Sequence, residues 1–480
     1  MNVYEPLMDP VALTVFILTL ILPVLVGFIA LKRTRDQTDF FIGGRGMGKV
    51  VIALSAVSSG RSSWLVLGVS GMAYTLGAGA VWAVAGYIVV ELLQFIFIGQ
   101  RLRTQTGSME SLTLLDYLES RFQDKTHWIR LTGAVILILF LTAYVAAQLN
   151  AGAKSLSTAL NMPLVASLGT SALLILIYMV LGGFIAVAYN DVVRAIIMII
   201  GLVFFPGYVL IKSGGVGVVM SSLKALNPSL VNPFALGAGV IIGFLGIGLG
   251  SPGQPHILVR YMAIKDASQL RWSAIIGTFW NIVMAWGALF IGLLGRYTFP
   301  TVASLPDKDP EMIYLALSSG TFGPAIYGLL IGGIFAAILS TADSQLLVVA
   351  STVVRDLYEK VIYKRRLSED VKLKLSRWVV VLSGLVAMVL AYSAKDIIFW
   401  LVLFAWGGLG ASFGPAIIMS LYWKGTTRGG VVAGMMTGTI VTIVWKLFLK
   451  SSTGIYELIP AFGMALVVIW IVSLAVKSRE

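Results

Sequence analysis

Two adjacent hydroxyl residues in the apolar stretch 322–354 form the first pattern that could do chemistry. Ser340 and Thr341 follow Ala337 by about one helical turn, so two hydroxyls and one backbone carbonyl can converge. Such oxygens suit a monovalent cation such as sodium when the surroundings are apolar and a broken helix supplies further carbonyls. Alternatively, both hydroxyls bond back to their own helix, as buried Ser and Thr often do. On these residues alone, the second interpretation is favoured.

Two other apolar stretches are interrupted by residues that do not sustain a regular helix. The stretch 47–75 contains SSGRSS at 58–63, and the stretch 235–259 contains GIGLGSPGQP at 246–255. Unpaired backbone in a membrane is tolerated only where it lines a cavity or is buried in protein. Interrupted helices at matching positions of two halves predict a transporter binding site. The alternative is two unrelated kinks in which glycine serves close helix packing.

The composition predicts an all-α integral membrane protein. Hydrophobic residues make up 58% of the 480 and charged residues 12%, whereas about a quarter of a soluble chain is charged. The stretch 11–31 has no charge and is long enough to cross a hydrocarbon core of about 30 Å as a helix. The apolar runs are continuous and do not alternate at period two, which argues against a β-barrel. A lipid bilayer is therefore the expected environment.

Composition also excludes several kinds of function. The net charge of +13 comes from residues in loops between spans, so nucleic-acid binding is not expected. The chain has no cysteine and only two histidines, His127 and His256, so thiol chemistry and a histidine-rich metal centre are excluded. No nucleophile–base set is present, so the chain is not expected to be an enzyme.

We predict thirteen spans in one transmembrane domain, 1–480, with no separate soluble domain. Lys and Arg are distributed unevenly between the two sides: 26 of the 35 fall on one side and eight on the other. By the positive-inside rule the N-terminus is outside and the C-terminus cytoplasmic, in the cell membrane. The remaining one, Arg61, lies inside the predicted span 47–75 and is assigned to neither side. The predicted spans are 9–31, 47–75, 79–100, 128–157, 163–182, 187–211, 235–259, 271–295, 322–354, 377–394, 397–421, 429–449 and 455–476.

Five motifs, in order along the chain, resemble the sodium:solute symporter family, and within it the bacterial sodium/proline symporter branch. The resemblance covers roughly residues 10 to 450. The motifs are FFIGGR at 40–45, GGFIAVAYND at 182–191, GQPH at 253–256, AAILSTADSQ at 336–345, and FGP with SLYWK at 413–415 and 420–424.

The resemblance implies a LeuT-type fold of two inverted five-helix repeats, about 47–211 (spans 2–6) and 235–421 (spans 7–11). One extra N-terminal helix and two extra C-terminal helices complete it. The implied function is a secondary symporter that couples Na⁺ entry to uptake of a small polar organic solute, an amino acid or short carboxylate, by alternating access. Na⁺ is the implied coupling ion, with no organic cofactor and no obligatory protein partner. Proton coupling and a transporter-like sensor module remain alternatives.

By resemblance, the cation ligands are the carbonyls of Ser58, Arg61 and Ala337 and the hydroxyls of Ser340 and Thr341. The chain departs from the branch nearby. Arg61 stands where the branch has a neutral residue, and it follows Gly60 in place of an aspartate. Asp343 stands where relatives with a second sodium site tend to have serine.

A buried arginine is normally paired, so we expect Arg61 to form a coupling network with Asp191 or Asp343. The alternatives are that Arg61 replaces a sodium ion outright, that an aspartate carries a proton and coupling is to H⁺, or that Arg61 snorkels to an aqueous vestibule. Glu91 is expected near an interface or hydrogen-bonded between helices, with no assigned role.

The resemblance also implies a solute site between the broken helices. Trp64 and Tyr144 match aromatic positions that line the proline site of the branch, and Gln148 adds an amide one turn after Tyr144. Ile247 and Ser251 replace the related aromatics on the second broken helix, where Pro255 is retained. The predicted pocket therefore keeps one aromatic wall and loses the other, so the sequence leaves the solute open. The competing interpretation is that Trp64 and Tyr144 are ordinary core residues.

Overall fold

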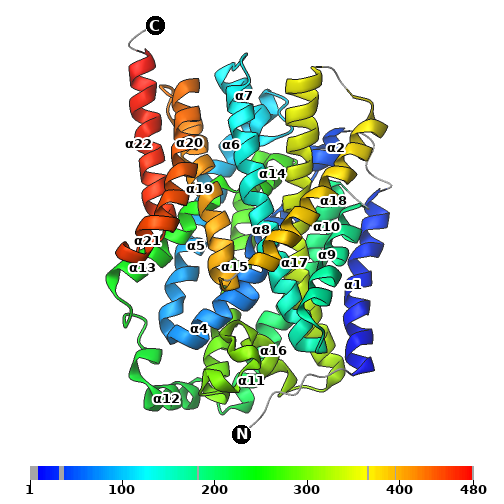
Figure 1. The fold of residues 1–480 in the computed structure, drawn as a ribbon, viewed down its shortest axis with the longest axis vertical. Helices are drawn as coiled ribbons and strands as arrows, with labels where there is room; N and C mark the ends of the chain where they lie inside the picture. The colour runs from blue at the N-terminus through cyan, green and yellow to red at the C-terminus, as the bar shows by residue number, and fades with distance from the viewer. Residues whose placement is uncertain (1–8, 32–36, 181–182, 365–366, 395, 478–480) are drawn as a thin grey trace.

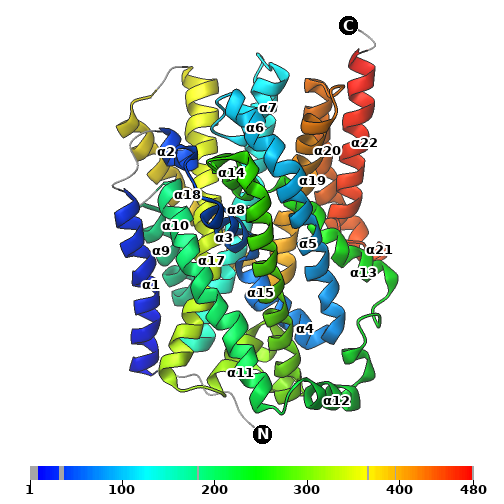
Figure 2. The same cartoon turned by 180° about the vertical axis from the view of Figure 1, so that it is seen from behind.

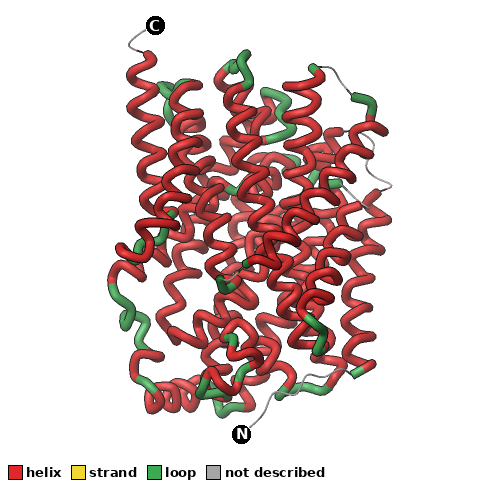
Figure 3. Tube along the Cα trace, in the orientation of Figure 1, coloured by secondary structure: helices red, strands yellow, loops and turns green. Residues whose placement is uncertain are grey.

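The computed structural model describes residues 9–31, 37–180, 183–364, 367–394 and 396–477, and most of these residues are helical (Figure 3). Within these ranges there is no β-strand, only an isolated bridge between Met47 and Ile264. The prediction of an all-helical chain is confirmed.

The helices of the first half are α1 Pro10–Leu31, α2 Gln37–Ile42, α3 Lys49–Ser63, α4 Ser70–Leu76, α5 Val81–Leu93, α6 Gln100–Ser108, α7 Leu114–Phe122, α8 Trp128–Leu160, α9 Leu164–Val180, α10 Phe184–Ile199, α11 Phe205–Lys212 and α12 Val216–Leu226. Those of the second half are α13 Ala238–Leu245, α14 Pro255–Ala263, α15 Leu270–Thr298, α16 Ile313–Ser319, α17 Pro324–Ser351, α18 Glu369–Ser393, α19 Ile398–Tyr422, α20 Arg428–Val444, α21 Lys450–Thr453 and α22 Leu458–Lys477.

Ten helical runs in the described ranges are long and apolar enough to cross a membrane, by length and composition. One of them, 49–108, covers two of the predicted spans and turns at Gly77, whose φ of 63° favours glycine. The predicted spans 163–182 and 235–259 correspond to shorter apolar helices. The chain is a multi-pass membrane protein.

The helix that contains α17 is longer than predicted, because wide helical turns continue it through Thr352–Tyr363. The sequence there is polar, which is why the predicted span ends at residue 354. Asp356 and Glu359 are nevertheless buried, since Asp356 pairs with Arg130 and Glu359 with Lys372. Pairing of these carboxylates allows the helix to run beyond the apolar stretch.

The long helices stand side by side, and α12 lies across one end of the molecule (Figures 1 and 2). The start of α1 and the end of α22 are at opposite ends. Burial separates central from peripheral helices: 83% of the apolar window is buried in α17 and in α19, against 28% in α1, α18, α20 and α22. The helices α17 and α19 are therefore the most buried of these ten helical runs.

Both predicted helix breaks are present. In the first, Ser62 has φ 45° and ψ −170°, and the chain then resumes helical turns at Trp64. In the second, tight turns over Gly246–Gly253 lead into α14, which begins at Pro255. A Cβ on Gly253 would meet the backbone of Leu409 and Gly410 in α19, so this segment packs against α19 backbone to backbone.

The first turn of α19 is held by a carboxylate from outside the spans. Glu311 accepts hydrogen bonds from the backbone N–H groups of Ile398 and Phe399, both at 2.8 Å. Lys154 of α8 lies 3.5 Å from Glu311 and 2.9 Å from Asp309. Burial raises the pKa of the Glu311 carboxyl to about 7, against the opposing effect of Lys154. Glu311 thus fixes where α19 begins.

Candidate functional site

Oxygen atoms from α17 and from the end of α3 converge in the interior. The Ser340 hydroxyl lies 3.1 Å from the Ser58 carbonyl and 3.0 Å from the Ala337 carbonyl. The Thr341 hydroxyl donates to the Ser59 carbonyl at 2.9 Å. All these residues are fully buried. Ser340 therefore bonds both to its own helix and to α3, whereas Thr341 bonds across to α3, so the arrangement in which both hydroxyls bond back to their own helix holds only for Ser340.

This oxygen cluster contains only neutral groups, three carbonyls and two hydroxyls, which is the donor set that a sodium ion accepts. This set differs from the predicted ligand set in one member, because the cluster contains the Ser59 carbonyl in place of the Arg61 carbonyl. The Arg61 carbonyl instead accepts a hydrogen bond from the Trp64 N–H across the break. Its place among cation ligands stays a prediction.

A second polar cluster adjoins the first through Ser59. The Ser59 hydroxyl lies 3.1 Å from an Asp191 oxygen and 3.2 Å from the Ser344 hydroxyl. Arg260 of α14 donates to the same Asp191 oxygen at 3.0 Å and to Ser344 at 2.5 Å. Arg260 thus connects the helix after the second break to α10 and α17.

Asp343 is also paired, with Arg194 at 2.7 Å. Arg194 and Arg260 were counted from the sequence as residues of the aqueous side, but both are buried. Arg194 follows Asp191 by three residues, and residues three apart lie on one helix face. This spacing could have indicated that Arg194 is a buried partner of the aspartates.

The predicted network between Arg61 and Asp191 or Asp343 is wrong. Arg61 donates to Glu91 of α5 at 3.2 Å and through Nε to Asn281 of α15 at 2.7 Å, and its guanidinium lies 3.6 Å from the centre of the Tyr87 ring. The snorkelling alternative is wrong as well, since Arg61 has 0% exposure.

Helix geometry explains the error. Arg61 follows Ser59 by two residues, which is about 200° around α3. Ser59 faces Asp191 on α10, so Arg61 points to the opposite side, toward α5 and α15. Arg194 and Arg260 already neutralise the two aspartates. Glu91 was the signal for the true partner, because it is the one carboxylate of the predicted span 79–100.

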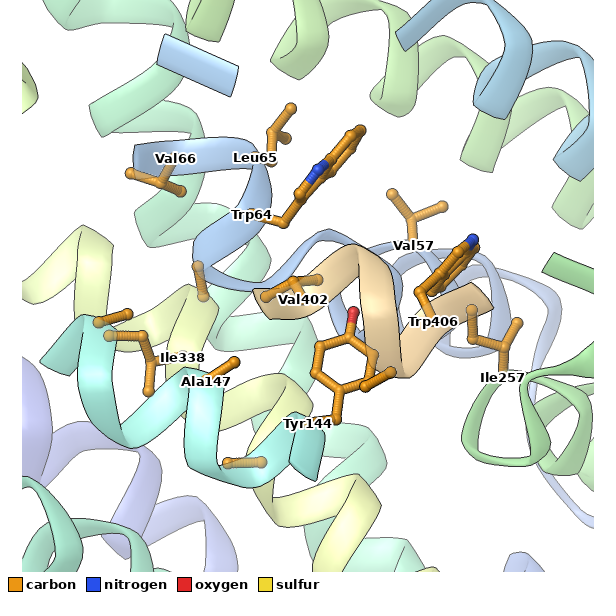
Figure 4. Packing of buried hydrophobic residues seen from close by; sticks show 14 of the residues in the cluster. Val57, Trp64, Leu65, Val66, Tyr144, Ala147, Ile257, Ile338, Val402 and Trp406 are labelled. Atoms are coloured by element: carbon orange, nitrogen blue, oxygen red, sulfur yellow. The ribbon is translucent and has the colours of Figure 1, made fainter. Parts of the chain in front are cut away.

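The predicted solute residues are all buried around the two breaks. Trp64 stacks on Phe399 of α19 with ring centres 5.7 Å apart, and Tyr144 lies edge-on to His256 at 6.1 Å. The Gln148 side-chain oxygen accepts from the Ser63 N–H at 3.1 Å. Figure 4 shows Trp64 and Tyr144 in this region, together with the α19 segment that carries Val402 and Trp406.

These residues do not share one cavity. Ile247 lines a cavity of about 260 Å³, the α13 cavity, together with Phe244, Leu403 and Lys450. Pro255 lines a smaller one of about 40 Å³, the α14 cavity, with Arg260, Ser344 and Asp356. Trp64, Tyr144, Gln148 and Ser251 line neither of these two and lie in the packed region around the breaks.

Phe399 contacts both Trp64 and two residues that line the α13 cavity. Its ring contacts Phe244 at 6.0 Å and Trp400 at 4.9 Å, both of which line that cavity, and it also stacks on Trp64. The residues around the breaks are thus buried, and none of Trp64, Tyr144, Gln148 and Ser251 lines either of these two cavities.

A helical membrane protein with two interrupted helices, and with cation-type oxygens beside them, has the features of a secondary transporter. The chain belongs to the sodium:solute symporter family, whose family model matches residues 40–438.

Curated relatives with similar sequences are named as transporters, in agreement with this family. The chain is 36% identical to the high-affinity proline transporter PutP of Bacillus subtilis, over 95% of this chain and 96% of that one. It is 35% identical to the sodium/proline symporter of Escherichia coli, over 95% and 91% of the two chains. The chain is accordingly a transporter and not an enzyme.

Solved structures support the fold alone. A substrate-bound, outward-open Na⁺-coupled sialic acid symporter matches with a TM-score of 0.81 at 19% identity, covering 98% of both chains. A nucleobase-cation-symport-1 family transporter in a closed conformation matches with a TM-score of 0.56 at 10% identity, covering 92% of this chain and 96% of that one.

Proposed function

We propose that the chain couples Na⁺ entry to uptake of a small amino or imino acid across the cell membrane, with proline as the first candidate. The observation that carries the proposal is the oxygen cluster between Ser340, Thr341 and the carbonyls of Ser58 and Ser59. The proline-transporting names of relatives that match nearly the whole chain support the solute class.

Sodium is favoured over a proton as the coupling ion. The cluster offers neutral hydroxyls and carbonyls, which bind a metal cation but do not take up a proton near neutral pH. The two nearest carboxylates, Asp191 and Asp343, are each paired with an arginine. A proton carrier would need a carboxylate free to change its charge.

The proposed topology is thirteen spans with the N-terminus outside, in a single domain whose repeats are about 47–211 and 235–421. Two observations support it. The broken helices fall at corresponding places in the two repeats, and a bridge joins Met47, just before α3, to Ile264, just after α14. The start of α1 and the end of α22 lie at opposite ends, as an odd number of spans requires (Figure 1).

In the proposed cycle, solute passes between the α13 cavity and the α14 cavity through the region of Trp64, Tyr144, Gln148 and Ser251. Na⁺ between α17 and α3 joins the broken helix to the central α17, which favours the closed arrangement. Opening toward the α14 cavity requires Arg260 to leave Asp191 and Ser344, because these contacts cross from α14 to α10 and α17. Each ligand shifts the cycle only by its differential affinity for the states.

A thermal-shift screen of purified protein tests the proposal. Amino and imino acids are each added in Na⁺ and in choline at equal ionic strength. A bound ligand raises the unfolding midpoint by mass action. We expect proline or a close analogue to raise the midpoint in Na⁺ and much less in choline. Equal shifts in the two salts would contradict sodium coupling.

A further inference from the structure

The buried guanidinium of Arg61 has one nitrogen left over. Nε donates to Asn281 and Nη2 to Glu91, whereas Nη1 has no hydrogen-bond partner in the described part of the chain. Arg61 is fully buried, and a buried donor without an acceptor is costly, more so when it is charged. Such an atom in a native structure requires an explanation.

Two neighbouring side chains also have unpartnered donors. Nε1 of Trp64 and Nε2 of Gln148 are buried without an acceptor among the described residues. Trp64 is three residues after Arg61 and packs on the same Tyr87 ring, at 6.1 Å. Gln148 is fixed to the break by its bond from Ser63. The break of α3 is therefore surrounded by surplus donors, which a ligand rich in acceptor oxygens would satisfy.

We propose that the Nη1 edge of Arg61 binds the carboxylate of the transported solute, and that Glu91 and Asn281 hold the guanidinium in position for it. The inference rests on the proposed function and names its specificity-determining residue. A planar guanidinium suits a carboxylate better than an ammonium does, because its N–H groups form a rigid fork. Glu91 and Asn281 come from α5 and α15, so the fork is fixed by two helices besides its own.

Electrostatic attraction would couple the carboxylate site at Arg61 to the Na⁺ site at the oxygen cluster. Arg61 and Glu91 together are neutral, so the carboxylate group of a bound solute adds a local negative charge near the break, even where the solute is a zwitterion with no net charge. Na⁺ at the oxygen cluster, which begins at the Ser58 carbonyl one turn earlier, attracts this carboxylate group. The solute carboxylate and Na⁺ therefore stabilise each other, and thermodynamic linkage makes the effect reciprocal.

The alternative is that Arg61 and Glu91 are only a structural ion pair. A variant that removes both charges distinguishes the two, because replacing a whole buried pair by uncharged residues is often tolerated. The variant is Arg61→Met with Glu91→Gln. Its matched control is Lys372→Met with Glu359→Gln, which removes a buried pair of 3.1 Å that contacts neither broken helix in the described ranges.

The experiment measures thermal shifts of purified protein with L-proline, L-alanine, acetate and pyruvate, and with the carboxamide of each, in Na⁺ and in choline. We expect wild type and the control to prefer a carboxylate over its amide by about tenfold or more in Kd, as a charge-assisted hydrogen bond implies. The double variant should lose this preference and retain its shift with Na⁺ alone. The Na⁺ affinity of wild type should rise with the carboxylate and not with the amide.

Other outcomes separate the inference from the proposed function. A carboxylate preference retained in the double variant, an amide that binds wild type equally well, or no binding by any carboxylate would overturn the inference. Carboxylate binding that is the same in choline would instead contradict sodium coupling and leave the carboxylate site standing. If the double variant does not fold, Arg61→Lys substitutes for it, because lysine keeps the charge beside Glu91 without the fork. Unchanged carboxylate affinity in Arg61→Lys would then count against the inference.

Discussion

Arg61 and Glu91 form an ion pair of 3.2 Å that joins α3 to α5 with no exposure to solvent. Arg61 directly precedes the non-helical Ser62, so its ion pair with Glu91 fixes the end of the first broken helix. Asn281 contacts both members, through Nε of Arg61 and through an oxygen of Glu91. The break is consequently tied to two neighbouring helices at its polar end.

A double-mutant cycle on Arg61 and Glu91 should show strong coupling in stability. Arg61→Met or Glu91→Gln alone leaves a buried charge without its partner, which costs roughly 3–5 kcal/mol. The double variant should be more stable than either single one. The measurement is the unfolding midpoint in detergent, with the pair Arg61 and Asp191 as control. That control should be additive within about 0.5 kcal/mol, and additivity for Glu91 would contradict the observed pairing.

Removal of the two α17 hydroxyls should weaken sodium dependence. Ser340→Ala with Thr341→Ala deletes both hydroxyl ligands of the proposed cation site, so the Na⁺ concentration for half-maximal uptake should rise by about tenfold or more. Thr442→Ala is the matched control, because this buried hydroxyl donates to Gly438 of its own helix at 2.7 Å and lines neither cavity. An unaltered sodium dependence in the double variant would rule out this site.

Substitutions around the breaks should impair solute binding. Trp64→Ala, Tyr144→Ala and Ser251→Trp each change the packed region between the two cavities, and each should raise the apparent KM by about tenfold or abolish uptake. Trp286→Ala is the control, since Trp286 is 51% exposed on the outside of the helix bundle. Normal transport by all three variants, at normal protein levels, would show that the solute site is elsewhere.

Glu311 should make stability depend on pH. Burial raises its pKa to about 7, so the folded protein holds this proton more tightly than the unfolded chain does. Its stabilising contribution is therefore complete below the ordinary pKa of glutamate and is lost as pH rises through about 7, by up to about 3 kcal/mol.

Glu311→Gln has no such titration. Its unfolding midpoint relative to wild type should rise between pH 4.5 and 8. A difference that is constant over this range would mean that Glu311 titrates normally and is not buried against Lys154 and the α19 amides.

Patterns local in sequence predicted much of the fold. Continuous apolar runs gave the helices, because a bilayer leaves few other solutions for the backbone. Dense Gly, Pro and Ser gave both breaks. The extension of α17 through Thr352–Tyr363 was missed, because it depends on Arg130 and Lys372, which are far away in the sequence.

The candidate site shows the same division. Two adjacent hydroxyls one turn after Ala337 are a local pattern, so the sequence could predict that Ser340 and Thr341 face other oxygens. The family resemblance added the Ser58 carbonyl, which the Ser340 hydroxyl contacts. The sequence did not predict Glu91 as the partner of Arg61. The direction of a side chain around α3 depends on the rotation of that helix against α5 and α15, which no local pattern specifies. Arg194 and Arg260 were misplaced, because counts of basic residues near span ends do not distinguish a loop from a buried last turn.

The most direct test of the account is gradient-driven uptake in proteoliposomes that contain the purified protein. Labelled proline is added with an inward Na⁺ gradient, with choline in place of Na⁺, and with an inward proton gradient without Na⁺. We predict accumulation above equilibrium with the Na⁺ gradient alone, abolished by a sodium ionophore and strongly reduced in Ser340→Ala with Thr341→Ala. Accumulation driven equally by the proton gradient, or unchanged in choline, would contradict sodium-coupled symport.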